Sequence, residues 1–404
     1  MNKIDKIWAE EIKDSRGNPT LKVTVFSGDN SASFSVPSGA STGIHEANVI
    51  ENNLAIKNVN EIIAPALIGK NIENQKELDE ILIKLDGTKN KSNLGGNAII
   101  GVSIAIAKAC AKVKGMGVFE YLRTLENIKI SHKVPFLYMN LINGGKHAKN
   151  DLAFQEYHIV PDTEDTSEAV QIGITIQNSI KEIILEKYGA DSIVLGDEGG
   201  YAPKITDIRE PLVILSDAIV KNNLQNKVRL ALDVASSSFY NHPNEGGDGT
   251  YKIADRNISK EELMSVYGNL IREFNLLSIE DPFNEEDFES FASLKTQNLN
   301  LKVVGDDLTV TNVERLQMVI DKKSINTIII KPNQIGTLSE TLATMKLARE
   351  NSIELIVSHR SGETDDDFIT DLAYAFGCYG LKSGAPSKPE RKVKYDRLIE
   401  ISKK

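Results

Sequence analysis

Short apolar runs that stop at a polar residue recur through the C-terminal two thirds of the chain. The run Thr327–Ile330 is apolar or β-branched throughout, as expected of a strand buried on both faces, and Lys331 follows it directly. The same arrangement recurs at five further runs, which stop at Asp233, Glu280, Asp306, His359 and Lys382. From Glu280 onward the stops are 23 to 28 residues apart. This spacing fits one strand, one helix and two loops, and predicts a parallel α/β barrel whose strand ends meet at one face that carries the chemistry.

The first part of the chain has a different pattern. Residues 1 to about 36 alternate between apolar and polar positions and contain two turn signals, which predicts antiparallel strands. Helical periodicity then dominates to about Arg123, and the stretch Ile99–Ala107 predicts a buried helix because it is far shorter than the ~20 residues of a membrane span. We therefore expect an α+β domain over residues 1–126 and a barrel domain with the active site over residues 132–404. The segment Asn241–Tyr251 predicts an exposed loop near the barrel mouth.

Composition excludes several classes of protein. The 404 residues are 41% hydrophobic and 26% charged, as in a soluble globular protein, and the net charge of -10 argues against nucleic-acid binding. The chain begins MNKIDKIWAE, with charges where a signal peptide needs an apolar core. The two cysteines, Cys110 and Cys378, are expected to be buried thiols in a reducing compartment. We therefore expect a cytoplasmic protein with no membrane span.

Three carboxylates end successive predicted strands: Asp233, Glu280 and Asp306. One such residue alone would be a solvated charge at the rim of the barrel, but three at equivalent positions repel one another unless a cation lies between them. Hard oxygen ligands of this kind suit Mg²⁺. Asp281 and Asp307 come next in sequence, and alternation would point their side chains elsewhere, so we expect structural roles for them.

Two lysines, Lys331 and Lys382, lie on the same predicted rim. Either could be a surface lysine whose ammonium reaches solvent. Beside a divalent cation, however, a buried lysine can lose its proton and act as a general base. That role requires lowering its pKa from ~10.4 by about two to three units, through burial and the nearby cation.

The segment SHRSGET places His359, Arg360 and Ser361 at one junction between strand and loop. A guanidinium fork, a hydroxyl and an imidazole together form a clamp for a phosphate or a carboxylate. The alternative is a solvated surface loop without a ligand.

Further polar residues complete the candidate site. Asp197 and Glu198 lie between glycines, which let the backbone approach a ligand closely, although a plain acidic turn has the same sequence. His147 follows a Gly-Gly pair, and Gln155 and Glu156 begin a strand-like run. With Mg²⁺, a lysine base and a glutamic acid, these residues imply removal of a proton next to a carboxylate and assisted departure of a leaving group.

The chain resembles the enolase family along nearly its whole length. The matching segments, in the order of that family, are DSRGNPT, PSGASTG, NVNEIIAPALIG, LGGNAIIGVS, NGGKHAKNDLAFQE, GDEGGYAP, SIEDPF, GDDLTVTN, IIIKPNQIGT, SHRSGET and GLKSGAP. The resemblance implies an α+β N-terminal domain and a C-terminal TIM-type (β/α)8 barrel that starts with a reversed ββαα unit. It also implies a lyase of glycolysis and gluconeogenesis, phosphopyruvate hydratase, which interconverts 2-phosphoglycerate and phosphoenolpyruvate.

The resemblance also implies two Mg²⁺ ions in each active site. Asp233, Glu280 and Asp306 would hold the first ion. Ser41, in the segment PSGASTG, would join the second ion, which arrives with the substrate.

Catalytic roles follow from the same resemblance, residue by residue. Lys331 resembles the base that takes the proton from carbon 2, and Glu198 the acid that protonates the departing 3-hydroxyl. The supporting catalytic residues would be Glu156, His147 and His359. The substrate would contact Gln155, His147, Glu156, Lys331, Arg360, Ser361 and Lys382, with Arg360 and Ser361 on the phosphate and Lys382 on the carboxylate.

Some positions depart from the family pattern. About a dozen residues that usually follow PSGASTGIHEA are skipped here, and Glu10 replaces a usual arginine used in dimer contacts. A homodimer or larger homo-oligomer is thus suggested by the family alone. Two alternatives remain open: a related enzyme that acts on another hydroxy acid, and an enolase-like surface-displayed binding protein that presents the terminal Lys403 and Lys404.

Overall fold

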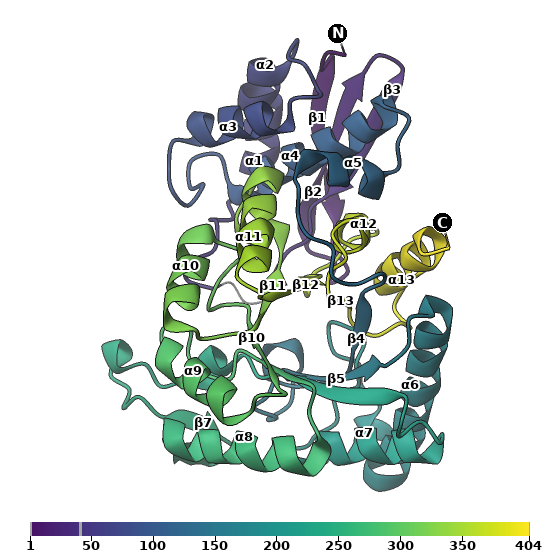
Figure 1. The fold of residues 1–404 in the computed structure, drawn as a ribbon, viewed down its shortest axis with the longest axis vertical. Coiled ribbons are helices and arrows are strands. Elements are labelled where there is room, and N and C mark those ends of the chain that lie inside the picture. Colours follow the sequence, from purple (N-terminus) through teal and green to yellow (C-terminus); the bar gives the residue numbers. More distant parts are fainter. Residues whose placement is uncertain (1, 40–42, 404) are drawn as a thin grey trace.

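A three-stranded antiparallel sheet lies at the N-terminal end of the computed structural model, which describes residues 2–39 and 43–403 (Figure 1). Its strands are β1 (Lys6–Lys13), β2 (Pro19–Ser27) and β3 (Asn30–Ser35), as the alternating pattern predicts. Alternation buries Leu21, Val23 and Val25 of β2. This face packs against helix α4 (Gly96–Val113), where a Cβ atom added at Gly101 would lie only 2.7 Å from Val23 Cγ2. The close approach of helix and sheet therefore requires the glycine.

Helix α4 is the central helix of this part of the molecule. It is long and apolar enough to cross a membrane by length and composition, but 83% of it is buried inside the protein. Its apolar surface is thus used by the core, which confirms the predicted buried helix. Four further helices accompany it: α1 (Asn52–Asn58), α2 (Ala64–Leu67), α3 (Gln75–Asp86) and α5 (Val118–Leu125).

Eight strands form a closed barrel below this sheet (Figure 1). They are β4 (Phe136–Asn143), β5 (Glu156–Pro161), β6 (Val228–Asp233), β9 (Ser278–Glu280), β10 (Lys302–Gly305), β11 (Thr327–Ile330), β12 (Glu354–Ser358) and β13 (Gly380–Lys382). Strand β5 pairs antiparallel with both β4 and β6, whereas all other neighbours are parallel. The expected reversed start of a TIM-type barrel is confirmed.

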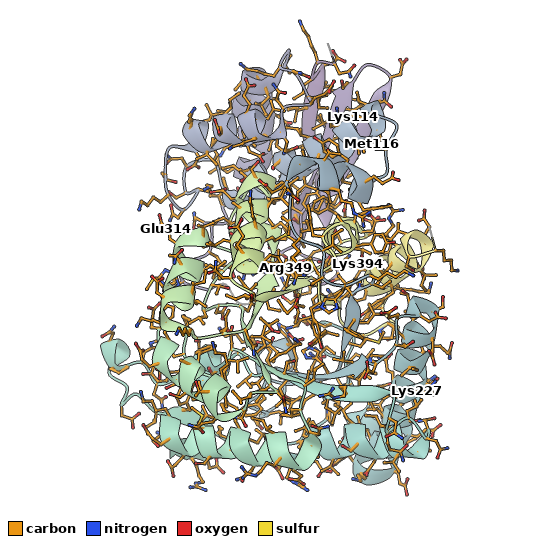
Figure 2. The ribbon with its side chains drawn as sticks, viewed as in Figure 1. Lys114, Met116, Lys227, Glu314, Arg349 and Lys394 are labelled. Atoms are coloured by element: carbon orange, nitrogen blue, oxygen red, sulfur yellow. The ribbon has the colours of Figure 1, made fainter. Side chains whose placement is uncertain are left out.

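Helices cover the outside of the barrel, and side chains fill the space between the strands and helices (Figure 2). The helices are α6 (Thr166–Tyr188), α7 (Glu210–Lys221), α8 (Lys260–Phe274), α9 (Phe288–Gln297), α10 (Val313–Lys322), α11 (Leu338–Glu350), α12 (Phe368–Ala375) and α13 (Pro389–Ile401). Helices α6 and α7 follow β5 in succession, so the chain has the order ββαα before strand and helix alternate. Helix α11 contacts α3 and α4 and thereby joins the barrel to the N-terminal elements.

The predicted exposed loop Asn241–Tyr251 is only partly a loop. Tyr251 begins a short hairpin, in which β7 (Tyr251–Ile253) pairs with β8 (Arg256–Ile258). The Tyr251 ring is buried, and its hydroxyl accepts a hydrogen bond of 3.0 Å from the backbone N–H of Asn284. The prediction was wrong for this residue, because its partners lie in a separate segment that local periodicity does not reveal.

Candidate active site

The polar residues at the strand ends meet at one mouth of the barrel. Asp233 and Glu280 are the last residues of β6 and β9 and lie side by side in the parallel register. Asp306 follows β10, and all three carboxylates are buried. Lys331, His359 and Lys382 follow or end β11, β12 and β13. The structure thus brings these predicted residues together around one cavity, whose lining includes Asp233, Asp306, Lys331, His359 and Lys382.

Lys382 lies among the acids at the mouth of the barrel. Its Nζ donates to Asp233 Oδ2 at 2.8 Å and to both oxygens of Glu280 at 2.9 Å, and it lies 3.4 Å from Glu156 Oε1. Burial opposes the charge of this ammonium, but Asp233, Glu156 and Glu280 outweigh it and raise the Lys382 pKa well above its usual range. In this structure the ammonium is paired with acids of the protein, and its expected contact with a substrate carboxylate stays a prediction.

Lys331 forms an ion pair with Asp306, whose other oxygen accepts a hydrogen bond of 2.8 Å from Gln334 Nε2. Burial favours the neutral amine, but the Asp306 carboxylate outweighs it and raises the Lys331 pKa. Burial alone therefore does not lower the Lys331 pKa, and the expected shift depends on burial and the nearby cation together. The neighbouring carboxylate must first be engaged by another cation before the amine can lose its proton.

Asp281 and Asp307, which follow Glu280 and Asp306 in sequence, also line the cavity. Asp281 accepts hydrogen bonds from the backbone N–H groups of Asp306 and Asp307, at 2.9 and 2.7 Å, and so fixes the turn that carries them. Asp281 itself has a positive φ of 42°. Oxygens of Asp281, Asp306 and Asp307 lie within 4.8 Å of one another, which makes this group a further candidate for holding a metal ion. Burial and the Asp306 charge raise the pKa of Asp307 to about 8.

The chemistry of these donors fits Mg²⁺, because buried carboxylate oxygens are the hard ligands that the ion prefers. In the part of the chain that the structure describes, Asp306 belongs to a close group of ligands, whereas Asp233 and Glu280 are joined by the Lys382 ammonium. The remaining predicted ligand, Ser41, lies outside the described residues.

A second buried group contains His147, Glu156 and Glu198. His147 Nδ1 lies 3.4 Å from Glu156 Oε1 and 3.5 Å from Glu198 Oε1, and ligand atoms of all three lie within 4.8 Å of one another. Asn140 Nδ2 donates to Glu198 Oε2 at 3.0 Å, and His158 Nε2 lies 2.8 Å from Glu156 Oε2. The amide and imidazole groups hold both carboxylates in fixed orientations.

The two carboxylates of this group titrate in opposite directions. Burial and the charge of Glu198 raise the pKa of Glu156 well above its usual range. Burial also opposes the charge of Glu198, but the facing His359 and His147 outweigh it and hold the Glu198 pKa well below that range. Glu156 is therefore the member that keeps a proton, and Glu198, the residue expected to act as the acid, is ionised.

The predicted clamp follows β12, and His359, Arg360 and Ser361 are all buried. The Arg360 guanidinium is bidentate with Glu46, with Nη1–Oε2 at 2.9 Å and Nη2–Oε1 at 3.2 Å, and Nη1 also donates to Asn333 Oδ1 at 3.2 Å. All three clamp residues line the cavity, as do Gln155, His147, Glu156 and Glu198. The buried Oε1 atom of Gln155 has no hydrogen-bond partner among the described residues, which suits a group that contacts a ligand.

Sequence reasoning missed several residues of the site, and two of them, Glu46 and Arg391, contact the predicted clamp. Glu46 lies in an irregular segment, and Arg391 lies in the first turn of α13 with a side chain that is 0% exposed. Neither follows a barrel strand, which was the signal used to find the other residues. Their contacts with Arg360 and His359 identify them, and Glu46 also lines the cavity.

Comparison with known proteins places both parts of the chain in one family. Residues 4–122 match the family model described as "Enolase, N-terminal domain", and residues 131–404 match "Enolase, C-terminal TIM barrel domain". The chain is 45% identical to "Enolase" of Methanocaldococcus jannaschii and 44% identical to "Enolase B" of Dictyostelium discoideum, in both cases over 98% of this chain and 94% of the relative. It is 43% identical to "Enolase 1" of Entamoeba histolytica over 98% of this chain and 95% of that protein.

Proposed function

This chain belongs to the enolase family and is a phosphopyruvate hydratase, a lyase of glycolysis, and we propose that the residues at the mouth of its barrel divide the work of dehydrating 2-phosphoglycerate as follows. The observation that supports this division is the convergence of Asp233, Asp306, two lysines and an arginine on one cavity, with Glu280 beside Asp233 on the Lys382 ammonium. The substrate carries two acidic groups and gives up a proton from carbon. Each requirement has a matching side chain in this set.

The family depends on Mg²⁺, and we assign the first ion to Asp233, Glu280 and Asp306. A second ion would involve Ser41. When bound, Mg²⁺ supplies the positive charge that stabilises the extra negative charge developing on the substrate carboxylate. The three acids that would hold the ion are buried, and electrostatic interactions are stronger there than in bulk water.

Lys331 is assigned as the base at carbon 2. The C2–H bond breaks and its proton moves to Lys331 Nζ, which requires that the ammonium first leave its ion pair with Asp306 and lose one proton to solvent. Lys382 offsets the charge of the substrate carboxylate, and Arg360 and Ser361 bind the phosphate, with Gln155 nearby. These contacts place carbon 2 within reach of the base.

Glu198 is assigned as the acid at the 3-hydroxyl. The C3–O bond breaks, its oxygen leaves as water with a proton from Glu198, and the electrons of the former C2–H bond form the C2–C3 double bond. Because Glu198 is ionised and Glu156 keeps a proton in this structure, Glu198 must gain that proton before the step. His147, which lies between the two carboxylates, is placed to pass it, and His359 borders Glu198 on its other side.

We also propose domain boundaries, an oligomeric state and a location for the protein. We propose an N-terminal domain over residues 1–126, a barrel domain over residues 132–404, a homodimer or larger homo-oligomer, and a location in the cytoplasm. Membership of a family of soluble glycolytic enzymes supports the location, and the family resemblance alone suggests the oligomer.

Formation of phosphoenolpyruvate, followed by its absorbance, tests the function. We expect turnover of 2-phosphoglycerate with Mg²⁺ and its loss when EDTA removes the metal. Non-phosphorylated hydroxy acids are tested beside it, and we expect them to react far more slowly because Arg360 and Ser361 then lack a ligand. Faster reaction of these analogues would favour the related enzyme for another hydroxy acid. Full activity in EDTA would contradict the assignment of Mg²⁺.

A further inference from the structure

Arg391 is a fully buried arginine beside the clamp residues. It lies in the first turn of α13, and its side chain is 0% exposed. Its Nε atom forms a long ion pair with Glu390, whose Oε1 lies 3.9 Å away. Burying a guanidinium is costly, so its hydrogen-bond partners show what it is used for.

The two ends of the Arg391 fork hold the backbone of the clamp. Nη1 donates to the carbonyl oxygen of Arg360 at 2.7 Å, and Nη2 donates to that of Ser361 at 2.7 Å. Two consecutive carbonyls are thus fixed by one planar group. A lysine, with a single nitrogen on a flexible stem, does not reproduce this geometry.

The same guanidinium also fixes the imidazole of His359. Nη1 lies 2.6 Å from His359 Nδ1, and an arginine has only N–H donors, so Nδ1 accepts. Burial, which disfavours the charged ring, lowers the His359 pKa to about 4, so the ring carries one proton. That proton is on Nε2, which lies 3.2 Å from Glu198 Oε1, although the N–H direction is not aligned with this oxygen.

We propose that Arg391 is a positioning residue, which selects the Nε2–H tautomer of His359 so that a protonated nitrogen, and not a lone pair, lies beside Glu198, and which holds the backbone carbonyls of Arg360 and Ser361. This inference deepens the proposed function, because it rests on Glu198 as the acid of the reaction. With the other tautomer, a ring lone pair would face the Glu198 carboxylate and repel it. Arg391 would thereby act on the 3-hydroxyl through Glu198 and on the phosphate through the clamp residues. It would not contact the substrate itself.

The tautomer can be measured without any reaction. We would label the six histidines of the chain with ¹⁵N, assign His359 from the signals lost in His359→Gln, and determine which ring nitrogen carries the proton. We expect a protonated Nε2 and an unprotonated Nδ1 in the unaltered protein. A protonated Nδ1 there would overturn the proposal, whether or not any variant folds and whether or not the protein acts on 2-phosphoglycerate.

Variants of Arg391 then test whether this residue determines the His359 tautomer. We expect Arg391→Lys and Arg391→Met to move the ring proton toward Nδ1 and to lower kcat roughly 10- to 100-fold, the loss typical of residues that orient a functional side chain. Arg397→Met is the matched control, since Arg397 lies on the same helix but pairs with Asp371 at 2.7 Å. It should leave the His359 tautomer unchanged. A folded Arg391 variant in which Nε2 keeps the proton would overturn the proposal.

Discussion

Glu46 occupies the guanidinium of Arg360 with both of its carboxylate oxygens, at 2.9 and 3.2 Å, and both side chains are only 4% exposed. A bidentate carboxylate and a phosphate use the same face of an arginine. The residue proposed to bind the substrate phosphate therefore has an anion of the protein on its fork. A phosphate bound at Arg360 would compete with Glu46 for this guanidinium.

We predict that Glu46→Gln binds inorganic phosphate more tightly than the unaltered protein, by about tenfold, because a neutral amide competes less well for the guanidinium than a carboxylate. Calorimetric titration with phosphate measures the change. Glu51→Gln removes the same charge from a nearby exposed residue that caps α1, and it should leave phosphate binding unchanged. Weaker binding by Glu46→Gln would show that Glu46 orients Arg360 instead of competing for it.

The second prediction concerns the Lys382 ammonium, which neutralises Asp233 and Glu280, two acids assigned to Mg²⁺. In Lys382→Met, Asp233 and Glu280 lose this partner, which should destabilise the metal-free protein by about 3–5 kcal/mol. Mg²⁺ would replace the missing charge, so the rise in Tm on adding Mg²⁺ should be larger in the variant than in the unaltered protein. Thermal unfolding with EDTA and with Mg²⁺ measures both effects.

The control for this experiment is Lys394→Met. Lys394 is equally buried but pairs with Glu363, away from the acids of the candidate metal site. Its loss should lower Tm with and without Mg²⁺ by the same amount. An equal response of the Lys382 variant to Mg²⁺ would contradict the assignment of Asp233 and Glu280 as ligands.

The sequence predicts the barrel and most of its mouth because both depend on local pattern. Apolar runs of strand length stop at Asp233, Glu280 and Lys382, and a parallel barrel brings all such ends together. Likewise, alternation in the first strands predicts the N-terminal sheet.

Contacts between distant segments could not be predicted in this way. Arg391 reaches His359 from the last helix, and Glu46 reaches Arg360 across 314 positions of the chain. Protonation states were also inaccessible, since the charge of Lys331 depends on how closely Asp306 approaches it. Periodicity places a residue at a rim but does not say which partner its side chain meets there.

Lys331→Ala provides a third prediction, aimed at the assigned base. Without the amine, exchange of the C2 hydrogen of 2-phosphoglycerate with deuterated water should fall by about 10²- to 10⁴-fold. Mg²⁺ binding, followed by calorimetry, should persist because the acids remain. Lys322→Ala removes an exposed lysine paired with Glu289 and should leave exchange unchanged. Exchange that continues at its normal rate in Lys331→Ala would reject this lysine as the base.

A buried ion pair away from the metal ligands gives the fourth prediction, which concerns stability and pH. Glu363 Oε2 lies 2.8 Å from the Nζ atom of Lys394, and both side chains are buried. Lys394 belongs to α13 and is labelled in Figure 2. Burial opposes the charge of Glu363, but Lys394 and Arg391 outweigh it and hold the Glu363 pKa below its usual range. A carboxyl with a depressed pKa in the folded state stabilises the protein at any pH above the unfolded value of about 4.3, and this contribution is lost as the pH falls through the folded pKa.

Glu363→Gln should therefore lower the free energy of unfolding at neutral pH by about 3–5 kcal/mol, because it leaves the Lys394 ammonium buried without its partner. Urea unfolding measured from pH 7 down to about pH 3 should show the difference shrinking below about pH 4, as the unaltered protein loses the same interaction. The exposed pair of Glu182 and Lys221, at 2.7 Å, is the control, and Glu182→Gln should leave the free energy of unfolding nearly unchanged because water screens this pair. A difference for Glu363→Gln that stayed constant or grew in acid would show that the pair does not hold the Glu363 carboxylate ionised in the folded protein.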